Sequence, residues 1–114
     1  MLIWKARCIV RTYIRITPDI EKANEAIPNG TFERLLMQTM EALKPEAAYF
    51  FADHGKRTAN LFFDLKDQSD IPRIAEPWFI EMNATVEFFP CMNADDVRLG
   101  LTKAMADMKM PTPV

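Results

Sequence analysis

Residues 45 to 65, PEAAYFFADHGKRTANLFFDL, read as two apolar strands around a tight turn. The strand segments, residues 47–53 and 57–65, are rich in the aromatic and apolar residues that favour sheets. Gly55 lies between them and can take the left-handed conformation that a hairpin loop of this length needs. The stretch therefore predicts a β-hairpin with the chain's single histidine, His54, in its turn.

The chain before this hairpin predicts a strand and a bent helical crossover. Apolar and polar residues alternate from residue 2 to 16, with residues 8–16 as the part that joins the sheet. Thr17-Pro18-Asp19 supplies a helix cap, a proline at the first helical position and an acidic first turn. Pro28-Asn29-Gly30 then interrupts the helix, and a second segment with an apolar face over residues 32–43 follows.

A third helix is predicted directly after the hairpin. Apolar residues within residues 71–82 recur at the spacing of a helix face, with Ser69 or Asp70 as the cap. Pro77 lies inside this helix, where it cannot donate a hydrogen bond to the carbonyl of Arg73. We therefore expect a kink at Pro77, and kinks of this kind often border pockets.

A fourth strand and a last helix complete the chain. Residues 84–89 read as the strand, and Asn93 with Asp96 three residues later resembles a capping box that opens the helix. The domain is expected to span residues 1–110, and the tail at 111–114 is expected to fray. Five apolar residues are expected on the inward side of the last helix: Val97, Leu101, Ala104, Met105 and Met108.

The order of elements predicts an α+β fold. Strand, helix, strand, strand, helix, strand is the ferredoxin-like βαββαβ arrangement with a four-stranded antiparallel sheet, here with an extra C-terminal helix. Right-handed crossovers place the first and third strands side by side at the centre and the helices on one face. The strand residues expected on the helix-covered face are Val10, Ile14, Phe50, Leu61, Phe63, Val86 and Phe88.

The other face of the predicted sheet is too aromatic for a simple solvated surface. Its expected members are Arg11, Tyr13, Arg15, Tyr49, Phe51, Asn60, Phe62, Glu87 and Phe89. A second copy that packs sheet against sheet would cover this face, and a two-fold pair buries the same patch on each subunit. The sequence therefore predicts a homodimer.

Four segments between about residues 22 and 101 carry a resemblance to a known superfamily: EKANEAI, LKPEAAYFFADHGKRTANLFFDL, IPRIAEPWF and FFPCMNADD. They resemble a group of small bacterial proteins, without an assigned activity, that look like members of the dimeric α+β barrel superfamily. The resemblance implies a dimer with a pocket either inside the joined sheets or between sheet and helices. Superfamily members include cofactor-free monooxygenases, isomerases, haem enzymes and plain ligand binders, so the fold does not select a function. The chain departs from the pattern at Cys91, where a valine is usual.

Composition narrows the possible partners. With 114 residues, 49% hydrophobic and 26% charged, the chain fits one globular domain. The net charge of −2 gives no positive field for nucleic acid or an anionic membrane. The start, MLIWKARCIVR, has no signal-peptide core, and no apolar run approaches the ~18 residues of a membrane span, so a cytoplasmic location is expected. Cys8 and Cys91 are expected to be reduced thiols, close together if the first and fourth strands pair antiparallel.

The segment KRTANLFF, residues 56–63, faintly echoes an RNA-recognition strand, with Tyr13 and Phe62 as stacking platforms. It lacks the glycine and the aromatic spacing of that motif, and the chain is acidic overall. No nucleic-acid partner is therefore expected.

Two aromatic side chains are candidates for a site, each with a plainer structural interpretation. His54 is the candidate general base, since an imidazole titrates near neutral pH, but a hairpin tip more often carries a solvated polar residue. Trp78 falls on the inward face beside Pro77, where it either lines a pocket or anchors the core.

Guanidinium groups on the uncovered face form the main polar constellation. Arg11 and Arg15 beside Tyr13 and Tyr49 are suited to a carboxylate or enolate ligand. The alternative to a ligand site is a cross-strand ion pair from Arg15 or Arg11 to Glu87 of the fourth strand. Arg57, early in the third strand, adds another cation. The predicted ligand-binding residues are thus Arg11, Tyr13, Tyr49, Arg57 and Trp78.

Two functions remain open from the sequence. The first is a homodimeric small-molecule binding module without chemistry of its own. The second is a cofactor-independent monooxygenase or isomerase that acts on a small aromatic or enolisable acid. No triad, phosphate loop or metal set appears in the sequence, so no cofactor and no metal site are expected, and a haem ligand would have to be His54 alone.

Overall fold

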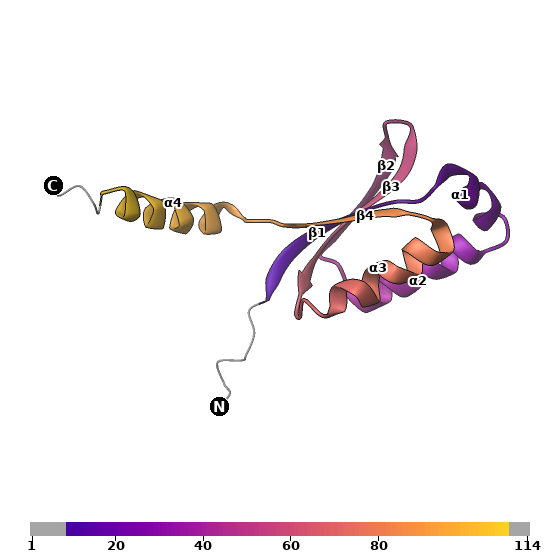
Figure 1. Cartoon of the computed structure of the whole chain (residues 1–114), viewed down its shortest axis with the longest axis horizontal. Coiled ribbons are helices and arrows are strands. Elements are labelled where there is room, and N and C mark those ends of the chain that lie inside the picture. Colours follow the sequence, from indigo (N-terminus) through magenta and orange to yellow (C-terminus); the bar gives the residue numbers. More distant parts are fainter. Residues whose placement is uncertain (1–8, 110–114) are drawn as a thin grey trace, which may run out of the picture.

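The structure is a computed structural model that describes residues 9–109 (Figure 1). Along the chain lie β1 (Val10–Thr17), α1 (Ile20–Ala26), α2 (Thr31–Leu43), β2 (Ala47–Asp53), β3 (Lys56–Leu65), α3 (Asp70–Met82), β4 (Thr85–Pro90) and α4 (Ala94–Lys109). The early part of the predicted first strand, with Cys8, and the predicted tail at 111–114 lie outside the described residues.

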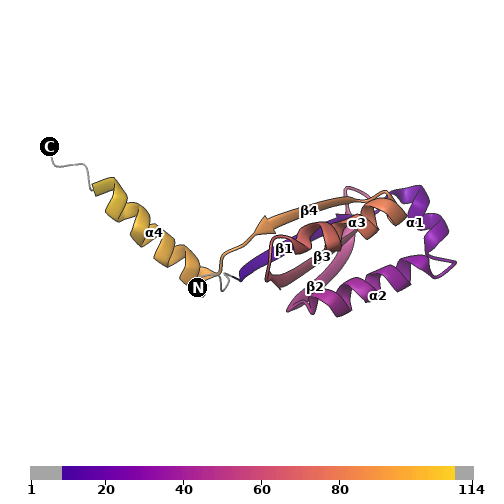
Figure 2. The same ribbon diagram turned by 60° about the horizontal axis from the view of Figure 1, so that its bottom comes forward.

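The four strands form one antiparallel sheet in the order β2-β3-β1-β4. This order confirms an α+β fold with a roughly ferredoxin-like topology and with β1 and β3 at the centre. The helices α2 and α3 pack against one face of the sheet (Figure 2). The opposite face, called the open face below, carries the odd-numbered residues of β1, β2 and β4 and the even-numbered residues of β3.

The hairpin predicted from residues 45–65 is present, with Asp53 paired to Lys56 across its turn. Its two turn residues both have positive φ, 54° at His54 and 80° at Gly55. A type I′ turn requires this backbone because its twist matches that of the flanking strands. The sequence predicts the left-handed conformation for Gly55 alone; the two-residue turn imposes it on His54 as well.

The crossover from β1 to β2 is bent as predicted, with one correction at its start. The helix cap is Asp19, whose Oδ2 accepts a hydrogen bond from the Lys22 backbone nitrogen at 3.1 Å. Pro18 therefore precedes the cap instead of occupying the first helical position. At the break, Gly30 takes φ 86° and α2 begins at the next residue.

The core lies between the sheet and the helices. Ile14, Leu61 and Phe63 from the predicted helix-facing set are fully or nearly fully buried, and Val86 and Phe88 pack against them. Two further members of that set, Val10 and Phe50, are instead 38% and 52% exposed. Val10 begins its strand and Phe50 lies on the edge strand β2, so burial is incomplete at both positions. Phe79 of α3, also expected to face inward, is 42% exposed.

The last helix differs most from the prediction. Its capping box is confirmed, because Asn93 Oδ1 accepts from the Asp96 nitrogen at 2.8 Å and Asp96 Oδ2 accepts from the Asn93 nitrogen at 3.0 Å. The side expected to face inward is solvent-exposed, and no residue of α4 is buried. The residues of that side are Val97, Leu101, Ala104, Met105 and Met108. Figure 1 shows α4 extending away from the sheet beyond the end of β4.

Candidate functional site

The open face is centred on a row of three aromatic rings. Tyr13 stacks on Phe62 at 4.8 Å between ring centroids and on Phe89 at 5.4 Å, with interplanar angles of 12° and 23°. Both faces of the Tyr13 ring are thus occupied by neighbours, which leaves no free stacking platform at this position. Its hydroxyl donates a hydrogen bond to Asn60 Oδ1, and Asn60 Nδ2 donates to the Tyr49 carbonyl at 3.2 Å.

An ion pair lies beside this row. Arg15 donates from Nε to Glu87 Oε1 at 2.8 Å and from Nη2 to Oε2 at 3.2 Å, across the β1–β4 pairing. The hydrogen bonds from Arg15 hold the pKa of Glu87 below its usual range, and the same bonds raise the pKa of Arg15. The guanidinium also lies over the Phe89 ring, at 5.3 Å from the centroid. The Arg15 charge is therefore balanced by a carboxylate of the same chain.

Arg11 pairs with the first turn of α4, beside a smaller hollow that Asp64 and Cys91 also line. Its Nη1 lies 2.9 Å from Asp96 Oδ2. The backbone nitrogen of Asn93, and then Arg11, hold the pKa of Asp96 below its usual value. The Cys91 nitrogen donates to the Arg11 carbonyl at 3.0 Å, and the Cys91 thiol contacts the same oxygen at 3.7 Å. The predicted proximity of Cys91 to Cys8 concerns a residue outside those that the structure describes.

Two other predicted residues lie apart from the open-face network. The His54 side chain is 92% exposed, and its Nδ1 lies 2.8 Å from Asp53 Oδ1. This neighbour orients the ring, although nothing encloses it. Arg57 lies on the helix side of β3 and donates to Asn24 Oδ1 of α1 at 3.0 Å.

Trp78 is an anchor of the core, as the plainer interpretation had it. It is 1% exposed, and its indole Nε1 donates to Thr39 Oγ1 of α2 at 2.9 Å. Thr39 in turn donates to the Leu35 carbonyl at 2.9 Å, and Phe32 packs edge-on against the indole. The buried Thr39 hydroxyl, which both accepts and donates a hydrogen bond, thereby joins α2 to α3.

The sheet thus divides the predicted ligand-binding residues into two groups. Tyr13, Tyr49 and Arg11 belong to the open face, whereas Arg57 and Trp78 lie on the helix side. No single site unites all five.

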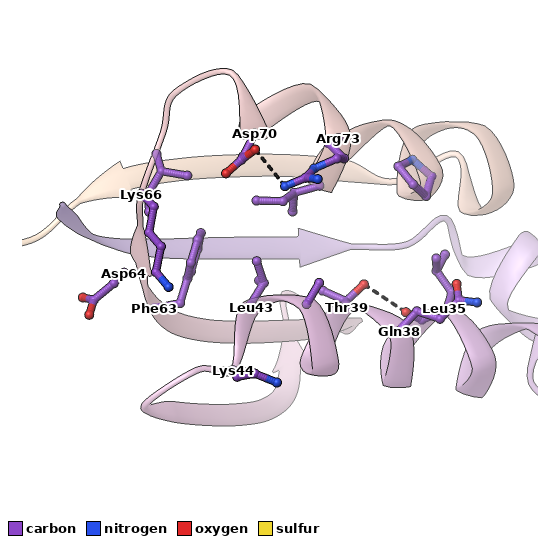
Figure 3. Close-up of a pocket in the computed structure, with 14 residues that line it drawn as sticks. Leu35, Gln38, Thr39, Leu43, Lys44, Phe63, Asp64, Lys66, Asp70 and Arg73 are labelled. Carbon is purple, nitrogen blue, oxygen red and sulfur yellow. Dashed lines mark hydrogen bonds and ion pairs between the residues drawn. The ribbon is translucent and has the colours of Figure 1, made fainter. Parts of the chain in front are cut away.

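A cavity of small-molecule size lies where sequence reasoning named no ligand-binding residue. It is a cleft of about 590 Å³ between α2, the end of β3 and α3 (Figure 3). A volume of this size is typical of small-molecule sites. Two expectations pointed here: the resemblance implied a pocket inside the joined sheets or between sheet and helices, and Pro77, expected to border a pocket, lines the cleft. The lining residues are Leu35, Gln38, Thr39, Ala42, Leu43, Lys44, Phe63, Asp64, Leu65, Lys66, Asp70, Arg73, Ile74 and Pro77.

The rim of the cleft carries more positive than negative charge. Arg73 pairs with Asp70 at 2.8 Å, and Lys44 pairs with Glu41 at 3.1 Å. The Lys66 side chain has no ion pair within the described residues 9–109. Figure 3 shows the Asp70–Arg73 pair on the α3 side of the opening and Lys66 at the end of β3.

The fold and this cleft define an α+β domain with a partly apolar, cation-rimmed cleft of small-molecule size. Comparison with protein-family models, with curated proteins and with solved structures finds no match to the chain. In the part of the chain that the structure describes, no helix is long and apolar enough to cross a membrane. The same residues bring together no group of three or more side chains suited to hold a metal ion.

Proposed function

We propose that the protein is a homodimeric small-molecule binding module, and that the ligand occupies the cleft between α2, β3 and α3. The observation that carries this proposal is the cleft itself, about 590 Å³ with mainly apolar walls. Leu43 and Phe63 face the opening from α2 and β3 (Figure 3). Such walls favour the hydrocarbon part of a ligand, because they remove apolar surface from water.

The charges at the rim favour an acidic ligand. Lys66 has no carboxylate partner among the described residues, and the Arg73 guanidinium can share its donors between Asp70 and a bound oxygen. An apolar body in the cleft would place a terminal carboxylate within reach of these two cations. The proposed ligand class is therefore a small apolar or aromatic carboxylic acid.

The open face supports the homodimer. Tyr49 and Phe51 are 62% and 56% exposed on this face, next to the row of stacked rings. Large exposed apolar patches on soluble domains mark interaction surfaces. A second copy supplies the same patch, so two-fold association would cover both at once.

Binding of a matched pair of probes tests the ligand site. Calorimetric titration with 4-phenylbutyrate and with its neutral amide should give tighter binding of the acid. Lys66→Glu should weaken acid binding by roughly tenfold and leave the amide unaffected. Lys22→Glu, the same charge reversal on α1 away from the cleft, is the control and should change neither. Recovery of the acid unaltered distinguishes a binder from an enzyme, and failure of both probes to bind would contradict the proposal.

A further inference from the structure

Helix α4 has an apolar stripe that no part of the described residues 9–109 covers. Val97, Leu101, Met105 and Met108 recur at helical spacing, and they are 39%, 60%, 52% and 71% exposed. An ion pair between Arg11 and Asp96 joins the first turn of α4 to β1. The rest of the helix lies beyond the end of the sheet (Figure 1).

A helix whose apolar side is exposed to water is only marginally stable by itself. Isolated helices shorter than about 12–15 residues are marginal in water, and α4 exceeds this length only slightly with 16 residues. Helices in proteins derive most of their stability from packing one apolar side. Gly100 in the middle of α4 lowers its helix propensity further. A Cβ added there meets nothing within 4 Å, so the single chain gives no steric reason for a glycine. Close approach of a surface from another chain would give a steric reason for glycine at this position.

The geometry of its first turn directs α4 away from its own sheet. The reciprocal capping of Asn93 and Asp96, together with the ion pair from Arg11, fixes the direction in which the helix leaves β4. The radius of gyration is 18.6 Å, whereas a compact domain of this size has about 13 Å. Contact with its own open face would require the connection after β4 to reverse and these bonds to break.

The open face of a second copy matches α4 in size. At 1.5 Å per residue, the 16-residue helix is about 24 Å long. The eight residues of β1 span about 26 Å at 3.3 Å each. The helix is therefore nearly as long as β1, so a helix laid along this strand would cover its open-face side chains Arg11, Tyr13 and Arg15.

The apolar area is also sufficient for a stable pair. The exposed apolar residues of the α4 stripe and of the open face are Val97, Leu101, Met105, Met108, Tyr49, Phe51 and Phe89. At roughly 150–250 Å² for a fully exposed large side chain, their exposed fractions amount to about 700 Å² per chain. A standard stable interface buries roughly 800 Å² per partner.

We propose that α4 is an exchanged arm whose apolar stripe packs on the open face of a second copy, while that copy's α4 packs on the first. This inference rests on the proposed homodimer and specifies the element that completes it. The stripe would lie over Tyr49 and Phe51 and the stacked rings centred on Tyr13. Because of the two-fold symmetry, both apolar stripes and both open faces would be buried in one dimer.

Photo-crosslinking in the full-length chain tests the contact. Met105 is replaced by p-benzoylphenylalanine, and isotopically labelled and unlabelled chains are mixed before irradiation. The expected product is an intermolecular crosslink to a peptide from β1, β2, β3 or β4 of the other chain. A crosslink within one chain, or from α4 to α4, would overturn the inference.

Charge substitutions separate the arm from the dimer itself. Leu101→Asp with Met105→Asp should raise the dissociation constant of the homodimer by roughly 100-fold or more, because two carboxylates would be desolvated at the contact. Leu99→Asp, on the opposite side of α4 and also exposed, is the matched control and should change it by less than about threefold. A dimer equally tight in all variants would overturn the arm and leave the homodimer standing. A wild-type chain that is monomeric at micromolar concentration would overturn both.

Discussion

Arg15 on β1 and Glu87 on β4 lie directly opposite each other and share two hydrogen bonds, at 2.8 and 3.2 Å. The pair leaves no net charge at the centre of the open face. Next to it the Tyr13 hydroxyl is bonded to Asn60, so the polar groups at this position are paired within the chain. Paired polar groups among exposed rings make this face suited to burial, since no isolated charge would have to leave water.

The Arg15–Glu87 pair predicts a defined pH dependence. Arg15 lowers the pKa of Glu87 in the folded chain, so the pair stabilises the fold above the ordinary glutamate pKa of about 4.3. That contribution is lost as the pH falls through the lowered pKa. NMR titration should give a pKa for Glu87 below the ordinary value of about 4.3 in the wild type and a higher pKa in Arg15→Ala. A Glu87 that titrates at its usual value in the wild type would refute the pairing.

The buried hydroxyl of Thr39 predicts a large effect from a small change. Thr39→Val removes the acceptor of the Trp78 indole N–H and leaves that donor unpaired in the core. The free energy of unfolding in urea should fall by about 1–3 kcal/mol. Thr102→Val on exposed α4 is the control, because Thr102 donates to Arg98 O as Thr39 does to Leu35 O. Equal effects at both positions would contradict the account.

The hairpin turn predicts that His54 is dispensable. His54→Asn retains a residue that tolerates positive φ, and Asn-Gly is a preferred type I′ pair. Calorimetric binding of the acid probe should therefore be unchanged, and the melting temperature should stay the same or rise slightly. Loss of ligand binding would instead give the imidazole a role in the site.

Pro77 inside α3, where a kink is expected, predicts opposite effects of one substitution on stability and on binding. Pro77→Ala restores the hydrogen bond to the Arg73 carbonyl, so the free energy of unfolding should rise by about 1 kcal/mol. Because Pro77 lines the cleft, straightening α3 should also weaken binding of the acid probe. Pro72→Ala, in the first turn of α3 where a proline removes no helical bond, is the matched control. A gain in stability at both positions would argue against the kink.

The fold could be predicted from the sequence wherever local pattern and tertiary packing agree. Alternation and turn chemistry gave the hairpin, and the order of elements gave the central pairing of β1 with β3. The stripe on α4 was also predicted, but as an inward face. Helical periodicity shows that a surface needs an apolar partner and carries no information on which chain provides it.

The site was less predictable. Trp78 was placed on the inward face from the sequence, whereas Arg57 was grouped with the open-face cations, and the strand register puts it on the helix side. The cleft combines residues from α2, β3 and α3 that are far apart in sequence. Its volume depends on how far two helices diverge over a sheet, which a single sequence does not encode in any local motif. The proline kink was the one local feature that indicated it.

The molar mass in solution tests the central claim that a second copy covers the open face. Light scattering coupled to size-exclusion chromatography at micromolar concentration should give twice the 13.1 kDa mass of the chain. The value should approach that of the single chain when the Leu101 and Met105 substitutions are combined. A wild-type mass of 13.1 kDa across the micromolar range would contradict the account.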